Sequence, residues 1–303
     1  MGEFRWSQLA SAGDGLFEPA RRVVGRGQYR GLTFHEVEAR SILSKAPPGT
    51  PWFSYSINAY RGCSHACEFC FARPTHEYLG FDMGSDFGTQ IVVKVNAVDL
   101  LRAELSPLRW QGDSIAMGTN TVPYQAAEGK YKLTRGIIEV LIERENPFSL
   151  LTKSPLVLRD LELIRAAAQV AEVSVSFSVA TLDEEIWRST EPGAPHPRKR
   201  LDALARLREA GVRGGVMMAP LLPGISDAPS QIAELRAAAH DAGAEWCHEV
   251  KLHLRGVRPH FMSWLERERP DLVARYERLY PLRVRRPRPP AKAAANDQLS
   301  LLS

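Results

Sequence analysis

Cysteine is scarce in this sequence, and long apolar runs are absent. Four cysteines occur among 303 residues, too few and too unevenly placed for the disulfide framework of a small secreted scaffold. There is no run of about 18 apolar residues, and the first residues lack the apolar stretch of a signal peptide. We therefore expect a cytoplasmic protein in a reducing environment, with no segment embedded in a membrane.

Most of the chain also lacks an excess of charge of either sign. The formal net charge is +4, but residues 281–303 alone carry five Lys and Arg against the single acid Asp297. The first 280 residues therefore have no net charge and no overall basic field that would attract nucleic acid. Nucleic acid is a weakly supported partner on these grounds.

The pattern of residue types divides the chain into four segments. Residues 1–50 have weak periodicity and several arginines around turn glycines, which indicates an N-terminal extension that acts as a basic arm or lid. Residues 51–258 alternate strand-like and helical patterns and form the predicted core. Residues 259–280 predict a C-terminal helix packed on that core and broken near Pro270. The Pro- and Arg-rich residues 281–303 predict a disordered tail.

Short apolar runs alternate with amphipathic segments throughout the core. The predicted strands are 55–59, 114–118, 148–153, 173–181, 214–222 and 246–254. The predicted helices between them are 97–105, 133–145, 158–168, 198–209 and 231–242. This alternation indicates an α/β fold with a parallel sheet, and six units fit a partial (β/α)6 TIM-like barrel better than a closed eight-stranded one. A doubly wound open sheet is the alternative, and in both folds the site lies at the carboxyl ends of the strands.

Three of the four cysteines, Cys63, Cys67 and Cys70, lie within eight residues. Three thiolates in one loop can hold three irons of a cubane cluster, which ordinarily has four cysteine ligands. The fourth iron then keeps an open coordination position where a ligand can bind. The alternatives are zinc with His65 or Cys247 as a fourth ligand, a redox disulfide and accidental clustering. A second pair of ligands is missing, which disfavours zinc.

The motif C-x3-C-x2-C, with Phe69 just before the last cysteine, resembles the signature of radical S-adenosylmethionine (SAM) enzymes. The longer stretch 58–79 is similar to an uncharacterised bacterial branch of that superfamily related to spore photoproduct lyase. Further similar stretches are 117–121, 123–125, 151–154 and 217–220. The resemblance runs from about residue 33 to residue 280 and is specific for cofactor and fold rather than for substrate.

The resemblance implies both the cofactors and the residues that bind them. The three cysteines would hold a [4Fe–4S] cluster whose open iron binds SAM. A reducing electron donor such as flavodoxin or ferredoxin would drive cleavage of SAM to a 5′-deoxyadenosyl radical, which abstracts hydrogen from substrate. The cofactor-binding residues carried over by position are Phe69, Gly118, Thr119, Asn120, Thr121, Lys153, Ser154, Ser176, Ser178, Met217 and either Arg198 or Arg200.

One functional position departs from the resemblance. In spore photoproduct lyase the loop after the second strand supplies a cysteine that donates hydrogen to the product radical, whereas residues 116–125 contain no cysteine here. Cys247 is distant in sequence, and a lone cysteine is usually a small buried hydrophobe. The sequence therefore predicts a radical SAM enzyme of unknown substrate. A DNA-lesion lyase and a non-catalytic zinc or nucleic-acid-binding module are the alternatives.

Overall fold

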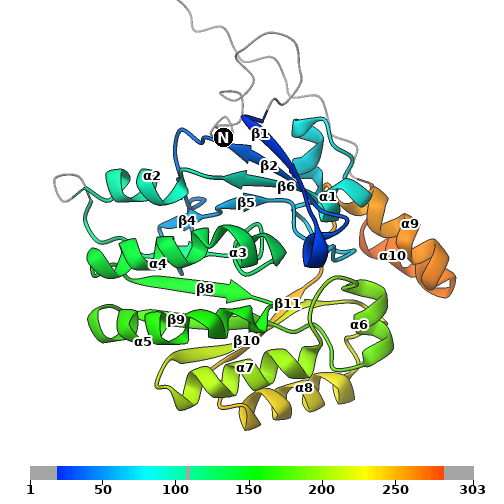
Figure 1. Ribbon diagram of the computed structural model, residues 1–303. Coiled ribbons are helices and arrows are strands. Elements are labelled where there is room, and N and C mark those ends of the chain that lie inside the picture. Colours follow the sequence, from blue (N-terminus) through cyan, green and yellow to red (C-terminus); the bar gives the residue numbers. More distant parts are fainter. Residues whose placement is uncertain (1–18, 107–109, 283–303) are drawn as a thin grey trace, which may run out of the picture.

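Parallel strands form the centre of the molecule (Figure 1). The computed structural model describes residues 19–106 and 110–282. Its larger sheet consists of β3 (Leu43–Lys45), β4 (Tyr55–Ile57), β7 (Ile115–Met117), β8 (Phe148–Thr152), β9 (Val173–Ser178), β10 (Arg213–Leu221) and β11 (Cys247–Lys251). The strand order is β11-β10-β9-β8-β7-β4-β3, parallel throughout except for the β3–β4 pair. Six parallel strands with two separate edges make an open barrel, which confirms the predicted fold class.

Helices cover this sheet where the apolar periodicity predicts them (Figure 1). They are α2 (Ala97–Glu104), α4 (Leu133–Glu143), α5 (Leu161–Val170), α7 (Pro197–Glu209) and α8 (Pro229–Asp241). In α4, Ile137, Ile138 and Leu141 are buried, whereas Glu139 and Glu143 on the opposite face are exposed. Burial of each such aliphatic side chain contributes roughly 1.5–3 kcal/mol, so packing against the sheet determines where the helix lies.

A second, four-stranded sheet contains the part of residues 1–50 for which the sequence predicts a basic arm or lid. Its order is β1 (Arg21–Val24), β2 (Thr33–Val37), β6 (Gln90–Lys94) and β5 (Tyr60–Arg61). The structure corrects the arm interpretation for the described residues. Residues 21–24 and 33–37 are paired strands, because Phe34 of β2 finds its apolar neighbours on β6, far along the chain. Local periodicity carries no signal for such a pairing.

The predicted strand 55–59 ends early, just before the chain passes from the larger sheet to the smaller one. Tyr55–Ile57 forms β4 in the larger sheet, and after Asn58 and Ala59 the chain enters the smaller sheet as β5. Cys63 follows β5 by two residues. The cysteine motif therefore starts where the two sheets meet.

Shorter helices complete the described fold. They are α1 (Ser85–Thr89), α3 (Ala126–Tyr131), α6 (Glu184–Thr190) and the 3-10 helices η1 (Gly27–Tyr29), η2 (Arg73–Leu79) and η3 (Pro155–Asp160). At the C-terminal end the chain forms α9 (Arg258–Glu268), η4 (Pro270–Leu272) and α10 (Val273–Leu279), with the break at Pro270. Phe261 and Trp264 of α9 belong to the same apolar cluster as Cys67 and Phe69.

None of the helices that the structure describes is long and apolar enough to cross a membrane. The disordered tail predicted for residues 281–303 lies almost wholly outside the described residues.

Candidate functional site

A cavity of about 270 Å³ opens at the carboxyl ends of the parallel strands. Residues from the ends of β7, β8, β9, β10 and β11 line it together with the cysteine loop 63–70. The sequence-predicted residues on its wall are Cys63, Cys67, Phe69, Cys70, Gly118, Thr119, Asn120, Thr121, Lys153, Ser178 and Met217. The fold thus brings most of the candidate residues to one place.

Backbone hydrogen bonds fold the cysteine loop tightly. The amide of Cys63 donates to the carbonyl of Phe87 over 2.9 Å, and the amides of Ala66 and Cys70 donate to the carbonyls of Cys63 and Cys67. Ala66 adopts a φ of 50°, in the left-handed region that non-glycine residues seldom occupy. Such backbone strain persists only where the surroundings enforce it.

Two buried polar side chains enforce this conformation. Arg73, only 2% exposed, donates to the carbonyls of Ala66 and Cys67 at 2.5 and 2.9 Å, and to two further carbonyls at 2.8 and 2.7 Å. Gln125, fully buried, donates to the Gly62 carbonyl and accepts from the Ser64 amide. Arg73 therefore acts as a structural clamp on the loop, and it does not line the cavity.

The thiol environment fits a multinuclear metal group better than a free thiolate. Burial raises the pKa of the Cys63 thiol to about 11, and it raises the pKa values of Cys67 and Cys70 as well. Three thiolates in this setting therefore need a strongly cationic partner such as iron. Within residues 19–106 and 110–282, no group of three His, Cys, Asp or Glu side chains is positioned to hold a metal ion.

The turn after β7 is shaped by a glycine and by Asn58. Gly118 has a φ of 93°, and a Cβ there would lie 2.1 Å from the Leu151 carbonyl oxygen, so only glycine fits. The Asn58 side chain donates to the Thr119 hydroxyl and accepts from the amides of Asn120 and Thr121. The sequence marks Asn58 only as part of the stretch 58–79 that resembles the family. Its three hydrogen bonds show that it holds the predicted SAM-binding turn in shape.

Lys153, which directly follows β8, is a cation on the cavity wall close to the ring of Phe69 in the cysteine loop. Its Nζ lies 2.9 Å from the Ser178 hydroxyl, 2.5 Å from a Glu191 carboxylate oxygen and 5.5 Å from the centre of the Phe69 ring. The second Glu191 oxygen accepts from Arg200, which is fully buried and also donates to the Ser178 carbonyl. Two cations therefore share one buried carboxylate beside the cavity.

The electrostatics of this triad favour the ionised carboxylate. Burial alone raises the pKa of Glu191, but the charges of Arg200 and Lys153 outweigh that effect and lower the pKa to about 2. Glu191 consequently remains negative, and the triad carries one net positive charge. An anionic ligand group in the cavity would find a preorganised cation at Lys153.

The segment that carries Glu191 is itself attached to the cysteine loop. The Glu68 amide donates to the Thr190 carbonyl, and the Gly193 amide donates to the His65 carbonyl over 3.0 Å. A Cβ on Gly193 would lie 2.1 Å from the Ser64 carbonyl oxygen. Any change in the position of the cysteine loop is therefore transmitted to Glu191 and Lys153.

Three predicted cofactor residues lie away from the cavity. Arg198 is solvent-exposed and pairs with Glu234, because it occupies the outer face of α7, whereas Arg200 points inward. The Ser154 hydroxyl accepts from the Leu156 amide at the start of η3. Ser176 lies two residues before Ser178 on the same face of β9. It sits further from the carboxyl end of the strand, and there Trp246 donates to its hydroxyl.

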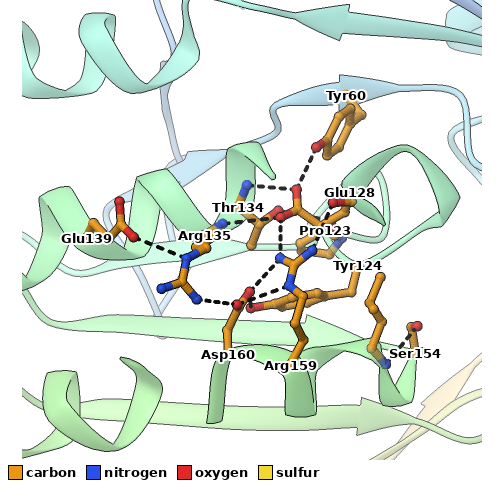
Figure 2. A network of polar contacts seen from close by, with 11 residues as sticks. Tyr60, Pro123, Tyr124, Glu128, Thr134, Arg135, Glu139, Ser154, Arg159 and Asp160 are labelled. Carbon is orange, nitrogen blue, oxygen red and sulfur yellow. Dashed lines mark hydrogen bonds and ion pairs between the residues drawn. The ribbon is translucent and has the colours of Figure 1, made fainter. Parts of the chain in front are cut away.

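A separate polar network joins Tyr60, Glu128, Arg159 and Asp160 in the interior (Figure 2). Glu128 accepts from the Tyr60 hydroxyl at 2.5 Å and from Arg159 at 2.8 Å. Asp160 accepts from Arg159 and from the Tyr124 hydroxyl. Tyr124 is thereby fixed in the interior and is not on the cavity wall, so the structure gives it no contact with a substrate.

The end of β11 also lines the cavity, although none of its residues is among the predicted site residues. Val250, Lys251, Leu252 and His253 form this wall, and Phe71 faces His253 with ring centres 5.6 Å apart. Phe71 is half exposed. Residues 247–253 contain no motif that would predict a place on the cavity wall. They reach it because the sheet curves and brings the end of β11 toward the cysteine loop.

The family is decided by the match to the radical SAM superfamily model, which covers residues 57–235, more than half of the chain. The chain belongs to the radical SAM superfamily. Membership implies SAM and an iron–sulfur cluster as cofactors, and the thiol loop and the strand-end cavity provide residues that fit both. The predicted superfamily is confirmed.

Curated relatives of this radical SAM protein are uncharacterised. A protein of Mycobacterium tuberculosis strain H37Rv is 46% identical over 289 residues, covering 91% of this chain and 85% of that one. A protein of Methanocaldococcus jannaschii is 30% identical over 239 residues, covering 78% and 85% of the two chains. A protein of Acidianus two-tailed virus is 28% identical over 218 residues, covering 70% and 71%.

Solved structures of spore photoproduct lyase share the fold of this radical SAM protein. One variant matches with a TM-score of 0.59 and 17% identity, covering 84% of this chain and 73% of that one. Another, with bound AdoMet and dinucleoside spore photoproduct, matches with a TM-score of 0.59 and 16% identity, covering 82% and 73%. At these identities the likeness concerns the fold alone.

Proposed function

We propose that this chain is a radical SAM enzyme in which Cys63, Cys67 and Cys70 hold a [4Fe–4S] cluster. The adjoining cavity would take SAM and the reacting part of a substrate. The observation that carries the proposal is the convergence of three thiols and five parallel strand ends on one cavity. When bound, the reduced cluster and SAM supply a 5′-deoxyadenosyl radical that abstracts hydrogen from the substrate.

The protein residues provide binding and orientation. Lys153, held by Glu191, supplies a cation for the carboxylate of SAM. The carbonyls and hydroxyls of the turn 118–121 accept hydrogen bonds from the ammonium group of SAM. Phe69 and Met217 offer apolar surface to the adenine. Leu151 and Leu252 add to the apolar wall, which keeps water away from a reactive radical.

The cavity wall favours chemistry without an internal thiol donor. Among the described residues that line it, the only cysteines are the three of the cluster loop. Cys247 packs at the edge of the main core instead, and the Tyr124 hydroxyl is occupied by Asp160. Hydrogen return to a substrate radical would then come from 5′-deoxyadenosine or from a donor outside this chain.

The first test is metal content with a SAM-cleavage assay. Anaerobically reconstituted protein should be brown and hold about four irons and four sulfides per chain. With dithionite and SAM it should release 5′-deoxyadenosine, measured by liquid chromatography. Cys67→Ala should lose iron and abolish the release, because a cubane with two protein ligands is held poorly.

Cys247→Ala is the matched control, because it removes the one cysteine that lies outside the loop. It should keep both the iron content and the 5′-deoxyadenosine release. A colourless protein that carries one zinc after iron reconstitution would contradict the proposal. Repair of a dimer-containing oligonucleotide would instead identify a lesion lyase that uses a donor other than a cavity cysteine.

A further inference from the structure

The cysteine loop separates two hollows of the protein. Cys63, Cys67, Phe69 and Cys70 line the cavity, whereas the intervening Ser64, Ala66 and Glu68 line a surface groove of about 510 Å³. Different residues of one loop thus line the two hollows. The groove therefore borders the same loop that carries the three cysteines.

Three parts of the chain form the walls of this groove. Arg30 and its neighbours come from the turn between β1 and β2, Ser85 and Gly88 come from α1, and His260 and Arg267 come from α9. The inner carboxylate, Glu68, is already matched, since it lies 2.6 Å from His260 and 3.9 Å from Arg73. The rest of the lining is cationic or neutral.

Two arginines at the rim are available to a partner. Arg30 and Arg267 are exposed, and neither forms an ion pair with any residue that the structure describes. Residues 20–32 carry four arginines and no acid. The nearby carboxylates Asp82 and Asp86 accept backbone hydrogen bonds around the start of α1.

We propose that this groove is the docking surface for an acidic, protein-bound one-electron carrier that reduces the cluster from the side opposite to SAM. This inference rests on the proposed function. SAM and substrate occupy the cavity side of the cluster. The groove therefore offers the remaining side from which an electron can reach the cluster. Electron-transfer encounters bury little surface and depend on complementary charge, which the exposed arginines provide. One electron leaves the reduced carrier and enters the oxidised cluster, with no atom or proton transferred.

The test compares two reductants on the reconstituted full-length protein. Stopped-flow bleaching of the cluster absorbance is followed with a reduced bacterial flavodoxin and, separately, with dithionite. In the Arg30→Glu/Arg267→Glu variant, the second-order rate constant with flavodoxin should fall about tenfold or more at low salt, and the difference should shrink as salt rises. Reduction by dithionite should not change, because a small reductant needs no docking.

The control variant, Arg165→Glu/Arg206→Glu, makes the same charge change on the outer faces of α5 and α7. Flavodoxin should reduce its cluster at the wild-type rate. Equal flavodoxin rates in all three proteins would overturn the docking surface, as would a wild-type protein that only dithionite reduces. If dithionite and SAM give no 5′-deoxyadenosine with the wild type, the proposed function itself is wrong. Loss of oligonucleotide binding with an unchanged flavodoxin rate would assign the arginines to nucleic acid instead.

Discussion

Replacing Glu191 with glutamine should destabilise the protein strongly. The carboxylate is 2% exposed and is the shared partner of Lys153 and Arg200, which are 7% and 0% exposed. Glutamine keeps the shape of the side chain but removes the charge, so two cations remain buried without a counter-ion. Breaking a buried ion pair by removing one partner costs about 3–5 kcal/mol.

The pKa of Glu191 gives an independent magnitude. Its fall from 4.5 to about 2 corresponds to about 3 kcal/mol in favour of the ionised form in the folded state. This lies at the lower end of the cost of breaking a buried ion pair, and we therefore expect the free energy of unfolding to fall by about 3 kcal/mol at neutral pH. Urea denaturation followed by circular dichroism, at matched iron content, measures this change.

Glu184→Gln is the matched control for this substitution. Glu184 pairs with Arg188 on the exposed face of α6, where solvent screens the charges and a pair is worth about 0–1 kcal/mol. A loss in Glu191→Gln no larger than that in Glu184→Gln would refute the reasoning. It would mean that water or backbone movement compensates the two cations.

Two further predictions follow from the same site. The folded-state pKa of Glu191 lies below its unfolded value, so the ionised carboxylate contributes fully to the free energy of unfolding above about pH 4.5, and this contribution disappears as the pH falls toward 2. The difference in unfolding free energy between wild type and Glu191→Gln should therefore close over that range. A difference that does not change with pH would contradict the assignment. Gly118→Ala should lower the free energy of unfolding by about 1–3 kcal/mol, because the added Cβ would collide with the Leu151 carbonyl. The same change should weaken SAM binding, measured by calorimetry. An unchanged affinity for SAM would show that the turn does not contact SAM.

Much of the fold follows from short-range patterns. The apolar runs at Phe148–Thr152 and Val173–Ser178 and the amphipathic period of α4 predict βα units directly, because each element buries one face against its immediate neighbours. The smaller sheet escaped prediction because β2 pairs with β6 far along the chain. Long-range strand pairing leaves no trace in local periodicity.

The candidate site divides in the same way. The cysteines are visible in sequence because their spacing and residue type are tied to chemistry, whereas the turn at Gly118 is marked by the resemblance to radical SAM enzymes. By contrast, whether Arg198 or Arg200 points toward the site depends on which face of α7 packs against Ser178, and this face is occupied by Arg200. The clamp formed by Arg73 depends on four carbonyls that only the folded chain assembles.

The two-sheet arrangement has a consequence for any shortened version of the protein. The residues matched by the superfamily model, 57–235, contain β6 but not β2, and β10 but not β11. A chain cut to that range would expose one side of β6 and one side of β10 as unpaired strand edges, which promote edge-to-edge aggregation. The smallest unit that keeps every strand pairing of the two sheets therefore extends from β1 through the last residues of β11, well beyond the segment that identifies the superfamily.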